Sequence, residues 1–523
     1  MVTDLQGTEL DIMSKNITEL MHALLDFAED KGLIEVEDRA YTLNRLLEIF
    51  AMDAPEGERP ARAASPETAT PILDALAGLA AERQLFPDSG EQRDLFTAKL
   101  MGALTPHPAQ VRARFEALRA NAGAKAATDD FYKLCRDVDY IRVDRIAKNL
   151  GFRHDSPCGE LEITINLSKP EKDPRDIAAQ RNAKQTGYPR CMLCVENPGY
   201  AGRVGFPARQ NHRVVPVTLG GAPWYLQYSP YAYYNEHCIV FNREHIPMKI
   251  DRGSFVRLLD FVEQFPHYFV GSNADLPIVG GSILSHDHFQ GGGHVFPMDR
   301  VGVRAALSAP ESGIEAWVVD WPMTCITLRG EDREKLVELA DKMLAAWRGW
   351  SDPSCDIFAE TDGTPHNTIT PIARMEDGKY RLNLVLRNNR TTPEHPLGLF
   401  HPHAELHHIK KENIGLIEVM GLFILPGRLV GELEGLKSYL TGATPIDAAP
   451  GADDPLSKHY SWIRELAAER GTSLTPEAAE AALRDGLAAK CAQVLADAGV
   501  YKNTPEGNAG LLRFLESIGY KKA

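Results

Sequence analysis

One stretch of the sequence, DLPIVGGSILSHDHFQGGGH from Asp275 to His294, constrains the fold and the chemistry of this chain more than any other. An apolar run from Pro277 to Leu284 leads into His286 and His288, and Gln290 and three glycines follow. A short apolar run predicts a buried strand, and alternate residues of a strand point to the same side. We therefore expect two imidazoles at the end of a strand, beside a glycine backbone that can approach a ligand closely.

The residue types after the apolar run suit attack on a phosphate. A neutral imidazole with one free nitrogen is a nucleophile toward phosphorus, provided that its other N–H has an acceptor. The Gln290 amide can donate to a phosphoryl oxygen, and the N–H groups of Gly291 and Gly292 can face an anion. Two alternatives stay open. One is a glycine-rich turn with structural histidines, and the other is a metal-hydrolase site, for which Asp287 is the nearby carboxylate, on the opposite strand face.

A Cys-x-x-Cys pair, Cys191 and Cys194, is half of a zinc site. The sequence has no second such pair, so the other ligands would have to be histidines, and His245 and His286 are the candidates. A redox pair and two core thiols are the alternatives. Eight cysteines in 523 residues are too few for a disulfide framework, which predicts reduced thiols.

The overall charge limits the partners that we expect. A net charge of −15 argues against a nucleic-acid coat and against a polybasic membrane surface. The N-terminal residues show no apolar region typical of a signal peptide, and no apolar stretch approaches the roughly 18 residues of a membrane span. We therefore expect a cytoplasmic protein that acts on small molecules. An anionic substrate would need a local basic cluster, and the candidates for it are Arg175, Arg181, Lys184, Arg190, Arg203, Arg209, Arg387, Arg390, Lys410 and Lys411.

Apolar residues with helical spacing predict helices over 14–51, 255–265 and 334–350. Alternation predicts a strand over 161–168, and the aromatic and β-branched stretch 224–242 predicts two more strands. Changes of pattern along the chain predict four regions. These are a helical region over 1–155, a first α/β half over 156–310 with the CxxC and HDHFQ motifs, a second α/β half over 311–440, and a C-terminal loop with helices over 441–523. Each half passes from strand to helix to strand and reaches a histidine pair, which suggests an internal duplication. The predicted fold class is α+β, with an N-terminal helical block.

The histidine pair of the second half is His401 and His403. It opens a segment, His401 to Gly421, that holds four histidines and two lysines. A second metal site, a contact with a sugar or a phosphate, and a polar rim beside a helix are the alternatives for this segment.

Two long motifs resemble a known family. The stretch DLPIVGGSILSHDHFQGG resembles the signature of the class II, largely bacterial, UDP-glucose–hexose-1-phosphate uridylyltransferases, and NLVLRNNRTTPEHPLGLFHPHAELHHIKKENIGLIEVMG resembles the C-terminal hallmark of the same family. The similarity runs from about residue 10 to the end of the chain. The resemblance implies a nucleotidyltransferase of the Leloir galactose pathway with two histidine-triad-like halves, and a more distant relation to the class I enzymes and the histidine-triad superfamily.

The resemblance also implies roles for single residues. His288 would be the nucleophile and Gln290 the amide that stabilises the phosphoryl group, with His286 ordering the loop. Class I enzymes have Pro and Gly where this chain has Asp287 and Phe289. The implied zinc ligands are Cys191, Cys194, His245 and His286. The implied substrate contacts are Asn273 for the uridine, Arg181 and Lys184 for a phosphate, and Ser285, Gly291 and Gly292 around the motif. His401 and His403 roughly match the metal-binding histidines in the second half of class I enzymes.

The expected reaction is a double displacement through a covalent uridylyl-histidine. UDP-glucose and galactose 1-phosphate would be exchanged for glucose 1-phosphate and UDP-galactose, with zinc as the one implied metal and no organic cofactor. Two rivals stay open: a histidine-triad nucleotide hydrolase or phosphorylase, and a non-catalytic protein that binds nucleotide sugars. The acceptor, galactose 1-phosphate or an N-acetylhexosamine 1-phosphate, and a homodimeric state also stay open.

Overall fold

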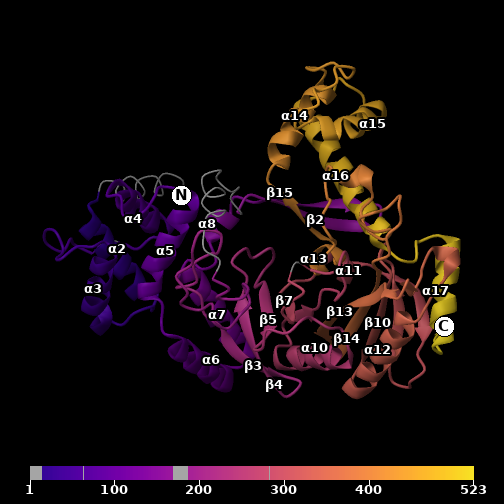
Figure 1. The fold of residues 1–523 in the computed structure, drawn as a ribbon, viewed down its shortest axis with the longest axis horizontal. Coiled ribbons are helices and arrows are strands. Elements are labelled where there is room, and N and C mark those ends of the chain that lie inside the picture. Colours follow the sequence, from indigo (N-terminus) through magenta and orange to yellow (C-terminus); the bar gives the residue numbers. More distant parts are fainter. Residues whose placement is uncertain (1–14, 63, 169–185, 282) are drawn as a thin grey trace. The chain divides into compact units, whose positions relative to one another are not determined.

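The computed structural model describes residues 15–62, 64–168, 186–281 and 283–523. The chain divides into two compact units. The first contains Met1–Lys148, Ser168–Thr218 and Ala222–His245, and the second contains Asn149–Leu167, Leu219–Gly221 and Ile246–Ala523. Both contain helices and strands (Figure 1), so the predicted α+β class is confirmed.

The first unit begins with the predicted helical block. Its helices are α2 (Ile17–Asp30), α3 (Arg39–Ile49), α4 (Thr70–Glu82), α5 (Gly90–Leu104), α6 (Pro108–Ala122), α7 (Ala124–Asp137) and α8 (Val143–Ile146). A capping box starts α2, because the Asn16 side chain accepts from the Glu19 N–H at 2.9 Å and the Glu19 carboxylate accepts from the Asn16 N–H at 2.8 Å. The apolar positions of α2 are buried, as their helical spacing predicts.

Three strands of the first unit follow in the order β5-β4-β3: β3 (Val215–Leu219), β4 (Ala222–Tyr228) and β5 (Cys238–Asn242). The two predicted strands in the aromatic stretch are β4 and β5, and they pair antiparallel, with Tyr228 opposite Cys238. The Tyr228 hydroxyl donates to the Thr128 carbonyl at 3.0 Å, which fastens α7 to β4. Among the described residues of the chain, no helix is long and apolar enough to cross a membrane.

The second unit is built on an antiparallel sheet with the order β16-β8-β9-β10-β14-β13-β6-β7. Its strands are β6 (Phe269–Gly271), β7 (His288–Gly292), β8 (Val303–Ser308), β9 (Glu315–Val319), β10 (Cys325–Gly330), β13 (Asn367–Glu376), β14 (Lys379–Asn388) and β16 (Lys521–Lys522). Helices α10 (Arg252–Gln264) and α12 (Arg333–Arg348), both predicted, pack on β13. The long strand β13 is not among the predicted strands, and it contains Pro371, a residue type that is uncommon inside sheets.

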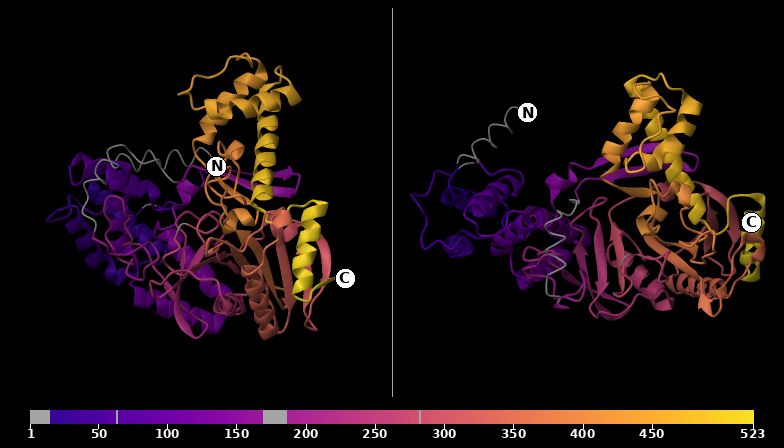
Figure 2. Two further views of the ribbon diagram at one scale, coloured as in Figure 1. Left: turned by 45° about the vertical axis from the view of Figure 1, so that its right-hand side comes forward. Right: turned by 45° about the horizontal axis from the view of Figure 1, so that its top comes forward.

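A second, three-stranded sheet has the order β1-β2-β15, formed by β1 (Leu150–Ser156), the predicted β2 (Gly159–Asn166) and β15 (Leu422–Pro426). The other α-helices of this unit are α11 (Pro297–Arg300), α13 (Leu416–Val419), α14 (Leu429–Thr441), α15 (Tyr460–Arg470), α16 (Pro476–Ala498) and α17 (Pro505–Ser517). The strands β11 (Glu360–Thr361) and β12 (Thr364–Pro365) form a short pair. Helices α14 and α15 both pack on α16, and the three stay together in both views of Figure 2.

The prediction of a strand over the apolar run before His286 is wrong. Residues 275–281 and 283–287 form a loop apart from the single-residue bridge of Gly280, and the strand begins only at His288. Pro277 and the positive φ of Ile278 (72°) break the extended path. A Cβ on Gly280 would lie 2.6 Å from the carbonyl oxygen of Ala274, so the loop folds tightly on itself at this position.

Candidate active site and metal-ligand group

Strand β7 presents the predicted nucleophile and the predicted amide on one face. His288 opens the strand and is 6% exposed, while Gln290 is half-buried. The strand pairs antiparallel with β6, which places Gln290 opposite Gly271 and Gly291 opposite Val270. Alternate residues share a side, so His288 and Gln290 point the same way. His286 precedes the strand, so the two histidines do not sit side by side on one strand as the sequence predicts.

One hydrogen bond selects the tautomer of His288. Its Nδ1 lies 2.8 Å from the backbone oxygen of His286, so Nδ1–H donates and Nε2 keeps its lone pair. The pKa of His288 is lowered to about 4, mainly by burial; the backbone hydrogen bond to His286 opposes the shift, and the nearby His286 ring contributes to it. A neutral imidazole with an available Nε2 is the form that a nucleophile toward phosphorus requires.

Asn273 is buried and joins the motif to a distant segment. Its Oδ1 accepts from the Leu416 N–H at 2.8 Å. A Cβ on Gly281 would lie 2.6 Å from its Nδ2, and a Cβ on Gly271 would lie 2.9 Å from Leu416. Asn273 therefore fixes Leu416 at the edge of the face that bears Gln290.

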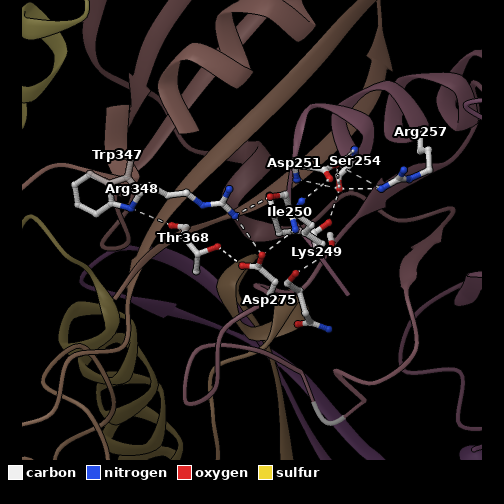
Figure 3. A network of polar contacts seen from close by, with 11 residues as sticks. Lys249, Ile250, Asp251, Ser254, Arg257, Asp275, Trp347, Arg348 and Thr368 are labelled. Atoms are coloured by element: carbon white, nitrogen blue, oxygen red, sulfur yellow. Dashed lines mark hydrogen bonds and ion pairs between the residues drawn. The ribbon is translucent and has the colours of Figure 1, made fainter. Parts of the chain in front are cut away.

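Asp275 anchors the loop before His286, although the sequence assigns it no role. Its carboxylate accepts from the Ile250 N–H at 2.9 Å and from the Thr368 hydroxyl at 2.5 Å, and Arg348 lies 3.3 Å away (Figure 3). A carboxylate at the start of a loop, just before Pro277, is the signal that points to such an anchor. Of the other predicted contacts, Ser285 is exposed, and Gly291 and Gly292 lie within β7.

The first unit brings three predicted metal ligands together. The thiols of Cys191 and Cys194 are 3.6 Å apart, and the Cys194 Sγ lies 3.1 Å from the His245 Nδ1. The Asn197 amide donates to the backbone oxygens of both cysteines, at 2.9 and 2.7 Å, and thereby shapes the turn. His286 belongs to the second unit, so its place as a fourth ligand stays a prediction.

The donor set of these residues fits zinc. Two thiols and one imidazole are the ligand types of structural zinc sites. Burial raises the pKa of Cys191 to about 11, and the nearby Cys194 adds to the shift. Thiols that are neutral in the metal-free protein become thiolate ligands only when a cation is bound.

The second histidine pair lies in a different setting. The His401 Nδ1 donates to the Pro402 oxygen at 3.1 Å, and the His403 Nε2 donates to the Leu399 oxygen at 3.1 Å. A short 3₁₀ turn, Ala404–Leu406, follows the pair. His403, Glu405 and Asp497 offer ligand atoms within 4.8 Å of one another, so carboxylates surround this histidine.

Several members of the predicted basic cluster form hydrogen bonds or ion pairs with other residues of the protein. Arg387 is buried, and its Nη2 donates to the Ile414 oxygen at 3.0 Å. Lys410 is paired with Glu418 at 2.9 Å, and Arg209 donates to the Tyr140 hydroxyl at 3.2 Å. Arg175, Arg181 and Lys184 lie outside the described residues. Arg387, Lys410 and Arg209 are therefore engaged by other residues of the protein, and a phosphate cradle formed by the remaining members stays a prediction.

Comparisons with known proteins identify the relatives of this chain. The galactose-1-phosphate uridyl transferase family matches twice, with its N-terminal domain over residues 32–247 and its C-terminal domain over residues 261–443. A solved structure, the yeast Ap4A phosphorylase Apa2, is 12% identical and covers 63% of this chain and 92% of that one. Its TM-score of 0.32 is too low for a comparison of folds.

Two curated relatives are similar over nearly their whole length. The galactose-1-phosphate uridylyltransferase of Caldanaerobacter subterraneus subsp. tengcongensis is 50% identical over 95% of this chain and 97% of its own. That of Bacillus subtilis is 47% identical over 97% of this chain and 98% of its own. On these matches, the chain belongs to the galactose-1-phosphate uridylyltransferase family.

Proposed function

We propose that this chain exchanges UDP-glucose and galactose 1-phosphate for glucose 1-phosphate and UDP-galactose, with His288 as the nucleophile. The state of His288 carries this proposal. The imidazole is neutral, its Nδ1 donates to a backbone oxygen 2.8 Å away, and its Nε2 keeps a lone pair on the face of β7 that also bears Gln290.

In the first half-reaction, Nε2 of His288 attacks the α-phosphorus of UDP-glucose. A phosphorus–nitrogen bond forms, and the bond from the α-phosphorus to the bridging oxygen breaks, so that glucose 1-phosphate leaves with the electron pair. In the second half-reaction, a phosphate oxygen of galactose 1-phosphate attacks the same phosphorus and Nε2 leaves. The leaving groups are stable anions, so positioning and charge stabilisation matter more than proton transfer.

Other residues would hold the substrates and the motif. The Gln290 amide donates to a phosphoryl oxygen as charge develops. Asn273 contacts the uridine, Arg181 and Lys184 contact a phosphate, and Ser285, Gly291 and Gly292 line the motif. Cys191, Cys194 and His245, with His286 as the fourth ligand, would hold zinc. Ligation would fix the His286 side chain and thereby order the loop before His288.

Isotope exchange tests the proposal. The protein is incubated with UDP-glucose and labelled glucose 1-phosphate in the absence of galactose 1-phosphate. We expect label to enter UDP-glucose in the wild type and not in His288→Ala, which should still bind UDP-glucose. His294→Asn is the matched control, because this histidine is paired with Glu162 at 2.8 Å and should keep the exchange.

The rivals give different products. Steady release of UMP from UDP-glucose alone would identify a hydrolase, and binding of UDP-glucose without exchange would identify a binding protein. Undiminished exchange in His288→Ala would remove this residue as the nucleophile. Parallel assays with galactose 1-phosphate and an N-acetylhexosamine 1-phosphate would then define the acceptor.

A further inference from the structure

Asp287, the residue between the two histidines of the motif, is a buried carboxylate that faces a cation. The residue is 5% exposed. Its Oδ2 lies 3.8 Å from Nη2 of Arg257, which comes from helix α10. Burial of a carboxylate is costly unless a partner compensates the charge, so this pair favours one position of the Asp287 side chain.

Arg257 is itself held in place by the first turn of its helix. Its Nη2 donates to the Ser254 hydroxyl at 3.1 Å and lies 3.8 Å from the carboxylate of Asp251, the N-cap of α10. The Ser254 hydroxyl donates in turn to the Lys249 oxygen at 2.7 Å, so the whole group is linked (Figure 3). These contacts fix the direction of the guanidinium group that faces Asp287.

The same guanidinium also contacts Phe289. Its Cζ lies 6.0 Å from the centroid of the Phe289 ring, which is cation–π distance. Phe289 follows His288 in β7, and successive strand residues point to opposite faces. Arg257 thus contacts Asp287 and Phe289, the residues before and after His288 in the sequence. It contacts Phe289 on the face of β7 opposite to that of His288.

The backbone around Asp287 decides the tautomer of His288. The Asp287 N–H donates to the Ile246 oxygen at 2.7 Å, and the Met248 N–H donates to the Leu284 oxygen at 2.9 Å. The His286 oxygen, which belongs to the peptide unit before Asp287, accepts from the His288 Nδ1 at 2.8 Å. A change in the direction of this peptide would remove that acceptor and misdirect Nε2.

We propose that Arg257 is a positioning residue for the transfer reaction: by holding Asp287 and Phe289, it fixes the peptide whose oxygen orients His288. The proposal rests on the proposed function of His288. In this role Arg257 acts through Asp287 and Phe289 rather than through contact with the reacting atoms. It acts on the rate of the chemical step and leaves the binding of UDP-glucose almost unchanged.

The test measures the exchange of labelled glucose 1-phosphate into UDP-glucose for wild type, Arg257→Met, Arg257→Lys and Asp287→Asn. Arg252→Met is the matched control, because Arg252 is on the same helix but is half-exposed and pairs with Glu334 at the surface. All assays are made well below the lowest melting temperature of the set, so that unfolding does not contribute to the rate.

We expect Arg257→Met to lower the saturating exchange rate between about 10- and 100-fold, with half-saturation by UDP-glucose changed less than about threefold. Arg257→Lys should recover most of the rate, since an ion pair at this distance needs charge rather than a forked geometry. Asp287→Asn should also lower the rate, and the double variant Arg257→Met/Asp287→Asn should be no slower than the slower single variant.

Three results would overturn the proposal: a rate for Arg257→Met equal to that of Arg252→Met, a loss confined to half-saturation, or additive effects in the double variant. If Arg257→Met does not fold, an unchanged rate in Asp287→Asn overturns it. Failure of the proposed function looks different, because the wild type itself would then show no exchange.

Discussion

The two histidine pairs of the second unit have the same sequence pattern and different surroundings. His288 begins a strand, its Nδ1 is held by a backbone oxygen, and Gln290 follows on the same face. His403 lies in a loop, its Nε2 is held by a backbone oxygen, and Glu405 and Asp497 surround it. In both cases a carbonyl selects the tautomer, so the neighbours decide what the free nitrogen can do.

These neighbours differ in charge. A neutral amide next to a free imidazole nitrogen can donate to an anion without repelling it. Carboxylates next to an imidazole repel an anion and attract a proton or a cation. The pattern His-x-His therefore marks a nucleophile only where carboxylates do not approach the free nitrogen, and the carboxylate next to His288, that of Asp287 just before β7, is paired with Arg257.

The largest expected difference between the two pairs is catalytic. His288→Asn should lower the exchange rate by at least about 10⁴-fold, as expected for the loss of a nucleophile. His403→Asn should change the rate by less than about tenfold, because carboxylates rather than a phosphate-binding face surround this ring. Rates measured with both purified variants test this, and equal losses would show that the second pair belongs to the catalytic machinery.

The amide beside the nucleophile should have the next largest effect. Gln290→Met keeps the size of the side chain and removes the donor, so the saturating rate should fall about 100- to 1000-fold. Half-saturation by UDP-glucose should change little, because the interaction strengthens as charge develops. Steady-state kinetics separate the two quantities, and an effect on half-saturation alone would make Gln290 a binding residue.

The cysteine pair should matter mainly for stability. We expect the purified protein to hold about one zinc per chain and Cys191→Ser to lose it, with a fall in melting temperature, because binding free energy contributes to folding. Cys355→Ser is the control, since Cys355 is half-buried and outside the candidate group. Metal analysis and thermal melts report both effects, and equal zinc content in the two variants would refute the ligand assignment.

The smallest expected effect concerns a third histidine pair, which has a buried carboxylate next to it. The His408 Nδ1 lies 2.7 Å from the His459 Nδ1, and the His459 Nε2 lies 2.9 Å from Glu432. Burial, aided by His459, lowers the pKa of His408 to about 3, and Lys490, Arg428 and Lys458 act in the same direction. The folded state therefore keeps this ring neutral at pH values where an unfolded chain would protonate it.

The sign of the pH effect follows from this difference. As the pH falls from about 7 toward 4, the unfolded state takes up a proton that the folded state refuses, so stability falls. The contribution is on the order of 1 kcal/mol after solvent screening. His408→Gln should flatten the decline of the melting temperature between pH 7.5 and 5, and an identical decline in the variant would contradict the assignment.

Much of the fold follows from local sequence patterns. The predictions of α2, α10 and α12, of β2, and of the pair β4 and β5 are confirmed, because their apolar residues repeat with the period of the element that forms. The prediction of a strand over the apolar run before His286 is wrong for a physical reason. Its length suits a strand, but Pro277 and two glycines let it fold back as a loop that is held by Asp275 and Asn273.

The site was predictable only in part. Spacing in the sequence relates His288 to Gln290 and Cys191 to Cys194, because these pairs are local. Contacts between distant segments have no such signal. Arg257 lies on the polar side of an amphipathic helix, where nothing in the sequence distinguishes it from other arginines. Only the folded chain brings it to Asp287. The anchoring of Leu416 by Asn273 depends in the same way on the tertiary structure.

The pairing of β2 with β15 has a consequence for the order of synthesis. β2 is the central strand of its sheet, and its parallel neighbour, Leu422–Pro426, leaves the ribosome far later. Until then, one edge of β2 has no strand to pair with, and exposed edges recruit other chains. A nascent chain interrupted before Leu422 should therefore aggregate through this edge, and a chaperone that covers extended segments would be needed longest at this strand.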